Sequence, residues 1–74
     1  MLAVKEITSR QREVLVMISG YAAAHGYAPS MREIMVAFGW HSTRSVLDHL
    51  RALEKNGAIT RRPGAARTIR IILP

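Results

Sequence analysis

The hydrophobic pattern of this chain changes its period once, close to Gly57. Before that point apolar residues recur at intervals of three and four, the spacing of a helix face that packs on a core. After it, apolar and polar residues alternate in two stretches, 58–61 and 68–71, as they do in half-buried strands. One such switch in a chain of 74 residues predicts a small helical bundle followed by one hairpin.

Three helices are expected before the switch, because three segments carry start signals. Thr8 and Gln11 can form a capping box, in which each side chain bonds the other residue's backbone N–H. Ser30 and Glu33 repeat the arrangement, and Ser42 is a good N-cap for the third helix. The expected helices are residues 9–25, 31–38 and 43–55. The expected stop signals are Gly26, Gly39 and Asn56-Gly57.

The fold class that follows is α+β and mainly α. A short turn with Gly39 joins the second and third helices, as in a helix-turn-helix pair, and Trp40 in that turn is expected to cover both helices. The two alternating stretches form a C-terminal two-stranded hairpin around a Pro63-Gly64 turn. We therefore predict a single domain over residues 1–74, a three-helix winged helix-turn-helix. The expected core residues are Val14, Leu15, Ile18, Tyr21, Ala22, Met31, Ile34, Met35, Phe38, Val46, Leu50 and Leu53.

Charge is distributed unevenly along the chain. The formal net charge is +6, and residues 40–74 hold seven Lys or Arg against two acids, a balance of +5. A basic half in so small a domain is typical of a protein that binds nucleic acid, although a merely solubilising surface is the alternative. The chain has no cysteine and no apolar run long enough to span a bilayer, so we expect a cytoplasmic protein with no membrane contact.

The third helix carries the candidate reading face. At 100° per residue, Arg44, Asp48 and Arg51 fall opposite the apolar stripe, with Ser45 and Leu47 at the edges. Arginine suits guanine O6 and N7, an acid can accept from cytosine N4, and an apolar side chain can meet a thymine methyl. The same residues could instead form exposed ion pairs on a solvated surface.

Phosphate contacts are expected at two further places. Ser30, Ser42 and Thr43 lie at helix N-termini, where free backbone N–H groups bind phosphate and the hydroxyls add donors; plain capping is the alternative. The hairpin is basic around its turn, which suits contact with the DNA backbone or minor groove. The arginines there are Arg61, Arg62, Arg67 and Arg70, of which the first three are candidate contacts. A mobile, solubilising loop is the alternative for this segment.

Catalysis and metal binding are not expected. His25, His41 and His49 lack metal-ligand spacing, and no nucleophile with a base can be assigned. We expect no metal, no cofactor and no small-molecule substrate. The expected partner is double-stranded DNA, with possible dimerisation or a protein partner. The alternative function is a protein-interaction module that modulates another repressor through its winged-helix surface, and the position of Leu47 on the third helix motivates it.

From Thr8 to about Ile72 the sequence resembles the N-terminal DNA-binding domain of the LexA repressor family. The matching stretches are residues 8–15, 26–34, 38–42, 49–59 and 66–71. The resemblance implies a winged helix and a regulator of transcription, a repressor of the SOS response in particular.

Two departures from the family pattern bear on function. The family reads its operator with an Asn and paired acids early in the recognition helix, where this chain has Arg44, Leu47 and Asp48. A different operator is therefore expected. The family also has a C-terminal domain that dimerises and cleaves itself with a Ser/Lys pair, and this chain stops at Pro74. Either a truncated repressor or a stand-alone regulator fits that observation.

Overall fold

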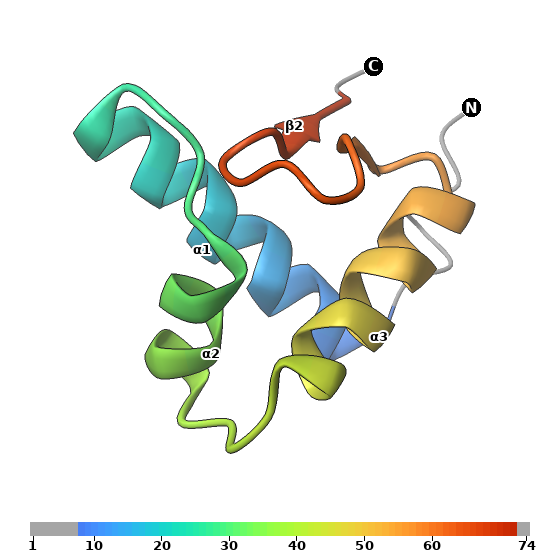
Figure 1. The fold of residues 1–74 in the computed structure, drawn as a ribbon. Helices are drawn as coiled ribbons and strands as arrows, with labels where there is room; N and C mark the ends of the chain where they lie inside the picture. The colour runs from blue at the N-terminus through green and yellow to red at the C-terminus, as the bar shows by residue number, and fades with distance from the viewer. Residues whose placement is uncertain (1–7, 73–74) are drawn as a thin grey trace.

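Three helices and a short hairpin make up the fold (Figure 1). The computed structural model describes residues 8–72. Its elements are α1 (Ser9–His25), α2 (Met31–Phe38), α3 (Thr43–Lys55), β1 (Ile59–Thr60) and β2 (Arg70–Ile71). All three helices begin and end where the sequence predicts, and the order confirms the three-helix winged helix-turn-helix class.

The first two helices start with the capping boxes that were predicted. Thr8 Oγ1 accepts from Gln11 N at 3.1 Å, while Gln11 Oε1 accepts from Thr8 N at 3.1 Å. Ser30 and Glu33 do the same for α2, at 3.2 and 2.8 Å. Ser42 has the extended backbone of an N-cap, but its hydroxyl makes no capping hydrogen bond, so the prediction holds for its position only. Such exchanges satisfy backbone N–H groups that a helix start leaves unpaired.

The core lies where the three helices and the hairpin meet. Each helix contributes apolar side chains from one face, and each fully buried aliphatic side chain contributes about 1.5–3 kcal/mol. The buried set is Val14, Ile18, Ala28, Ile34, Val46, Leu50, Leu53, Ala58, Ile59 and Ile69. Leu15, Met31, Met35 and Phe38 were also expected inside, and they pack around this set while partly exposed. Tyr21 and Ala22 were expected inside as well, but they are only partly buried and lie outside this packed set. The small size of the domain leaves them at its rim.

The hairpin is shorter than the sequence predicted. The alternating stretches 58–61 and 68–71 were expected as strands. Only two residues of each stretch take part in strand pairing, Ile59 opposite Ile71 and Thr60 opposite Arg70. Thr68 is the reason. Its hydroxyl accepts from Arg62 N at 2.9 Å and lies 3.3 Å from Arg62 O, so a side chain replaces the next ladder bonds. We call residues 61–69, the connection between the strands, the wing.

Trp40 closes the turn between α2 and α3. Its ring stacks on Phe38 at 4.8 Å and on His49 of α3 at 4.7 Å between ring centroids, and it packs partly buried against the core. This agrees with the expected cover over both helices. The stack of three rings thus links the end of α2 to α3 across the turn.

Candidate nucleic-acid interface

The outward face of α3 is open to solvent as predicted. Val46, Leu50 and Leu53 are buried on the opposite side, which turns Arg44, Asp48 and Arg51 outward. The side chains of Arg44 and Asp48 are 80% and 59% exposed, and Arg44 Nε lies 3.5 Å from Asp48 Oδ1. The face therefore presents two guanidinium groups and a carboxylate within two helical turns.

The edges of this face are only half exposed. Ser45 and Leu47 both have intermediate accessibility, which agrees with their expected place at the edges. The backbone carbonyl of Ser45 lies 2.8 Å from His49 Nδ1, one turn further along. The edges of the face are thus less accessible than the three charged residues between them.

At the start of α3, two hydroxyls lie beside backbone N–H groups that have no partner within the helix. Ser42 and Thr43 are exposed, and the hydroxyl of Ser42 makes no capping bond. At the start of α2 the situation differs, because Ser30 Oγ already accepts from Glu33 N. The two helix starts are therefore unequal, and α3 keeps more hydrogen-bonding capacity for an anion.

Arg61 lies at the base of the wing and is engaged within the protein. Its Nε donates to Glu54 Oε1 of α3 at 3.0 Å, and its side chain is only 12% exposed. The sequence placed Arg61 among the phosphate contacts without indicating this partner. An i to i+7 pair that joins a helix to the start of the wing leaves no periodic signal.

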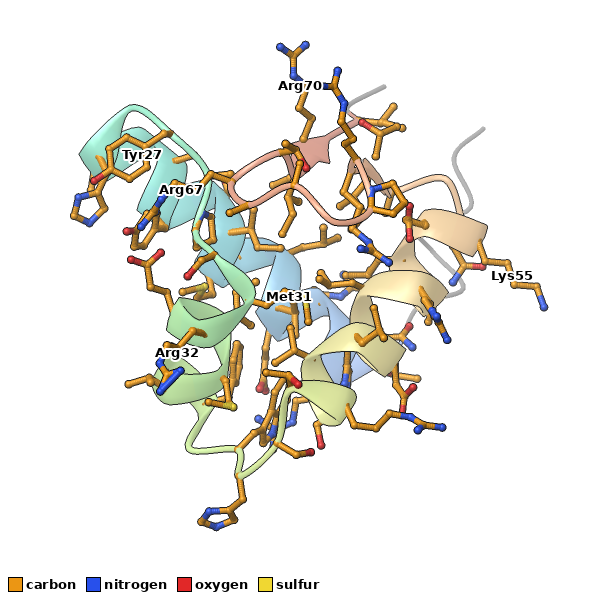
Figure 2. All side chains as sticks on the ribbon, in the orientation of Figure 1. Tyr27, Met31, Arg32, Lys55, Arg67 and Arg70 are labelled. Atoms are coloured by element: carbon orange, nitrogen blue, oxygen red, sulfur yellow. The ribbon has the colours of Figure 1, made fainter. Side chains whose placement is uncertain are left out.

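Arg67, at the other end of the wing, is engaged more extensively. Its Nη1 and Nη2 donate to Glu33 Oε1 and Oε2 of α2, both at 2.9 Å, and the guanidinium carbon lies 4.8 Å from the ring centroid of Tyr27. Figure 2 shows Arg67 and Tyr27 side by side between the wing and the end of α1. The bonds from Arg67, followed by the one from Ser30 N, lower the pKa of Glu33 from 4.5 to about 2.

A match to a family model decides the identity of this fold. The model described as LexA DNA binding domain matches residues 4–68. The chain belongs to this family.

Curated LexA repressors agree with the family model. The chain is 43% identical over 68 residues to the LexA repressor of Geotalea uraniireducens and 47% identical over 64 residues to LexA repressor 1 of Nocardia farcinica. It is 45% identical over 65 residues to the LexA repressor of Halorhodospira halophila. The matches cover 92%, 86% and 88% of this chain but 34%, 30% and 29% of the relatives. The chain thus spans about a third of their length.

In this LexA-family domain the third wing arginine, Arg62, carries an exposed positive charge. Within residues 8–72, neither Arg62 nor Arg70 forms an ion pair, and both are exposed. Arg70 points outward from β2 in Figure 2. Wing residues 64–69, Met31 and Leu50 line a hollow of about 260 Å³, which brings the wing next to both helices of the helix-turn-helix pair.

Metal-type clusters and membrane-length helices are both absent from residues 8–72. Among residues 8–72 no cluster of three or more His, Asp or Glu side chains is placed to hold a metal. None of the three helices is long and apolar enough to cross a membrane. The family matched is a DNA-binding domain rather than a catalytic one.

Proposed function

We propose that this single domain binds double-stranded DNA in a sequence-specific manner, as a LexA-like regulator and repressor of transcription. α3 enters the major groove and the wing lies on the phosphate backbone. The observation that carries the proposal is the exposed face of Arg44, Asp48 and Arg51 on the second helix of a LexA-type helix-turn-helix pair. A recognition helix of this class reads base edges with its outward side chains.

Within this proposal the side chains of α3 contact different bases. Arg44 or Arg51 grips guanine O6 and N7, and Asp48 accepts from cytosine N4. Leu47 contacts a thymine methyl from the edge of the face, and the small Ser45 permits close approach. Because Arg44 is a donor and Asp48 an acceptor, neighbouring positions of the site should differ in the base they favour.

Phosphate contacts hold the domain in register. Ser42 and Thr43 at the start of α3 and Ser30 at the start of α2 supply N–H and hydroxyl donors. Arg62 is the wing cation that forms no ion pair within residues 8–72. The prediction that Arg61 and Arg67 contact phosphate remains a prediction, and their carboxylate partners favour a role in holding the wing.

A fluorescence-anisotropy titration tests the proposal, with a labelled pool of random duplexes and then with a duplex selected from that pool. Binding should weaken steeply with salt, by about 0.9 in log–log slope for each phosphate neutralised. The unlabelled random pool should displace the labelled selected duplex less effectively than the unlabelled selected duplex does. Absence of any binding at about 50 mM salt, where phosphate contacts are strongest, contradicts the proposal.

The alternative, a protein-interaction module, is separated by a pull-down from bacterial lysate with and without nuclease. DNA binding predicts that captured proteins are lost on nuclease treatment. A stoichiometric protein that stays bound and protects α3 from hydrogen exchange favours the alternative.

A further inference from the structure

Arg67 connects the wing to two distant parts of the chain. Besides its two bonds to Glu33, its Nη1 donates to the Ala28 carbonyl at 3.2 Å and to Tyr21 Oη at 3.3 Å. Within residues 8–72, every side-chain hydrogen bond between the segment 60–72 and the segment 8–38 comes from this one residue. Besides the packing of Ile69 in the core, the wing is therefore attached to α1 and α2 by the hydrogen bonds of a single guanidinium.

The backbone of Arg67 indicates that these contacts are strong enough to hold an unfavourable conformation. Its φ is 60°, and it is the one residue other than glycine with positive φ in the described part of the chain. A side chain with a Cβ adopts this region at a cost and persists there when its surroundings hold it. The contacts with Glu33, Tyr21 and Ala28 are those surroundings.

Glu33 serves the start of α2 and the wing at the same time. Its Oε1 accepts from Ser30 N at 2.8 Å and from Arg67 Nη1 at 2.9 Å, and its Oε2 takes the second bond of Arg67. The wing is thus bonded to the first turn of the helix-turn-helix pair. With its low pKa, Glu33 stays ionised at every pH at which DNA binding is ordinarily measured.

We propose that Arg67 is a positioning residue, which with Glu33 holds the wing in the place where it and α3 can contact one duplex together. The inference rests on the proposed function. The rival view is that Arg67 contacts phosphate itself. The two views disagree about Glu33, because a direct contact treats that carboxylate as a competitor for Arg67 while a positioning role requires it.

Glu33→Gln decides between them. A glutamine oxygen can still accept from Ser30 N, so the cap of α2 is kept, but the charge that grips Arg67 is lost. The substitution also removes a negative charge, which by electrostatics alone favours binding to a polyanion. Weaker binding by a variant that stays folded can then be assigned to loss of position. Glu13→Gln is the matched control, because Glu13 forms an exposed pair with Arg10 at 2.9 Å, away from the wing.

The binding measurement uses the duplex selected by the wild-type domain. Glu33→Gln should weaken binding by about fivefold or more, the lower end of ordinary coupling between two sites, and Glu13→Gln should not weaken it. Arg67→Lys keeps the charge but cannot make the two parallel bonds, so it should weaken binding as well. Arg67→Gly removes the backbone cost of the positive φ but also removes the guanidinium. Its binding should therefore also be weaker than that of the wild type.

The second readout is the free protein, by amide chemical shifts and hydrogen exchange. In Glu33→Gln and Arg67→Lys the amides of residues 62 and 64–69 should shift and exchange faster, while those of the α1 and α3 core residues stay protected. Binding by Glu33→Gln that is as tight as wild type, or tighter, overturns the inference, as does an unchanged wing. If the wild-type domain binds no duplex at all, the proposed function fails and this inference fails with it.

Discussion

Arg44 and Asp48 face each other across one turn of α3, with Nε and Oδ1 3.5 Å apart. Both side chains are exposed, and an exposed i,i+4 pair of this kind contributes only about 0.3–0.5 kcal/mol. A good base-edge contact discriminates by about 1–3 kcal/mol, so such contacts can displace the pair. The pair is therefore compatible with a reading role for both residues.

Arg44→Ala and Asp48→Ala should each change the sequence that the domain prefers. The expected shift is about 1–3 kcal/mol at the affected base pair, because each variant loses one donor or acceptor for a base edge. Selection from randomised duplexes measures the change. Lys55→Ala, exposed in the last turn of the same helix, should select the wild-type motif. An unchanged motif with both reading variants would show that other residues carry the specificity.

Arg62→Ala should weaken binding to all sequences alike. Loss of one phosphate contact should also flatten the salt slope by up to about one unit, with the melting temperature almost unchanged. Anisotropy titrations at several salt concentrations measure both effects. A new preferred motif in this variant would instead place the wing among the readers of sequence.

Arg61→Ala should lower thermal stability, unlike Arg62→Ala. Arg61 is largely buried against Glu54, and its removal leaves that half-buried carboxylate without its partner. Thermal unfolding followed by circular dichroism makes the comparison between the two neighbouring arginines. Equal melting temperatures for both variants would mean that the ion pair at the base of the wing contributes nothing to folding.

The lowered pKa of Glu33 predicts a specific dependence of stability on pH. Because its pKa is lowered to about 2 in the folded state from 4.5, its contribution is complete above about 4.5 and is lost as pH falls toward 2. The free energy of unfolding should therefore fall with acid over that range, and less steeply in Glu33→Gln. Urea unfolding at a series of pH values tests this. Parallel curves for the variant and wild type would contradict the assignment to Glu33.

Leu53→Ala should unfold a large fraction of the protein. A buried Leu→Ala substitution costs about 2–5 kcal/mol, close to the whole of the roughly 3–5 kcal/mol that so small a core supplies. Val16→Ala is the control, because Val16 is 66% exposed. Urea unfolding followed by circular dichroism should show a large loss for the first variant and little for the second. A small effect of Leu53→Ala would mean that the core tolerates the cavity.

Local signals in the sequence determined the helices. The bonds of each capping box join residues three apart, and the apolar stripes repeat within one helical turn, so a short window of sequence contains the information for both. The outward position of Arg44, Asp48 and Arg51 followed from the same periodicity. The hairpin was predictable as an element, but the length of its strands was not, because Thr68 replaces ladder bonds with its own hydroxyl.

The surroundings of the wing arginines were decided by tertiary structure alone. Arg61, Arg62 and Arg67 look alike in the sequence, as three cations around a turn. Only the fold brings Glu54 to the first and Glu33, 34 residues away, to the third, and leaves the middle one in solvent. A charge that the chain neutralises internally and a charge that it presents outward differ only in their neighbours. Those neighbours come from segments that no local pattern connects.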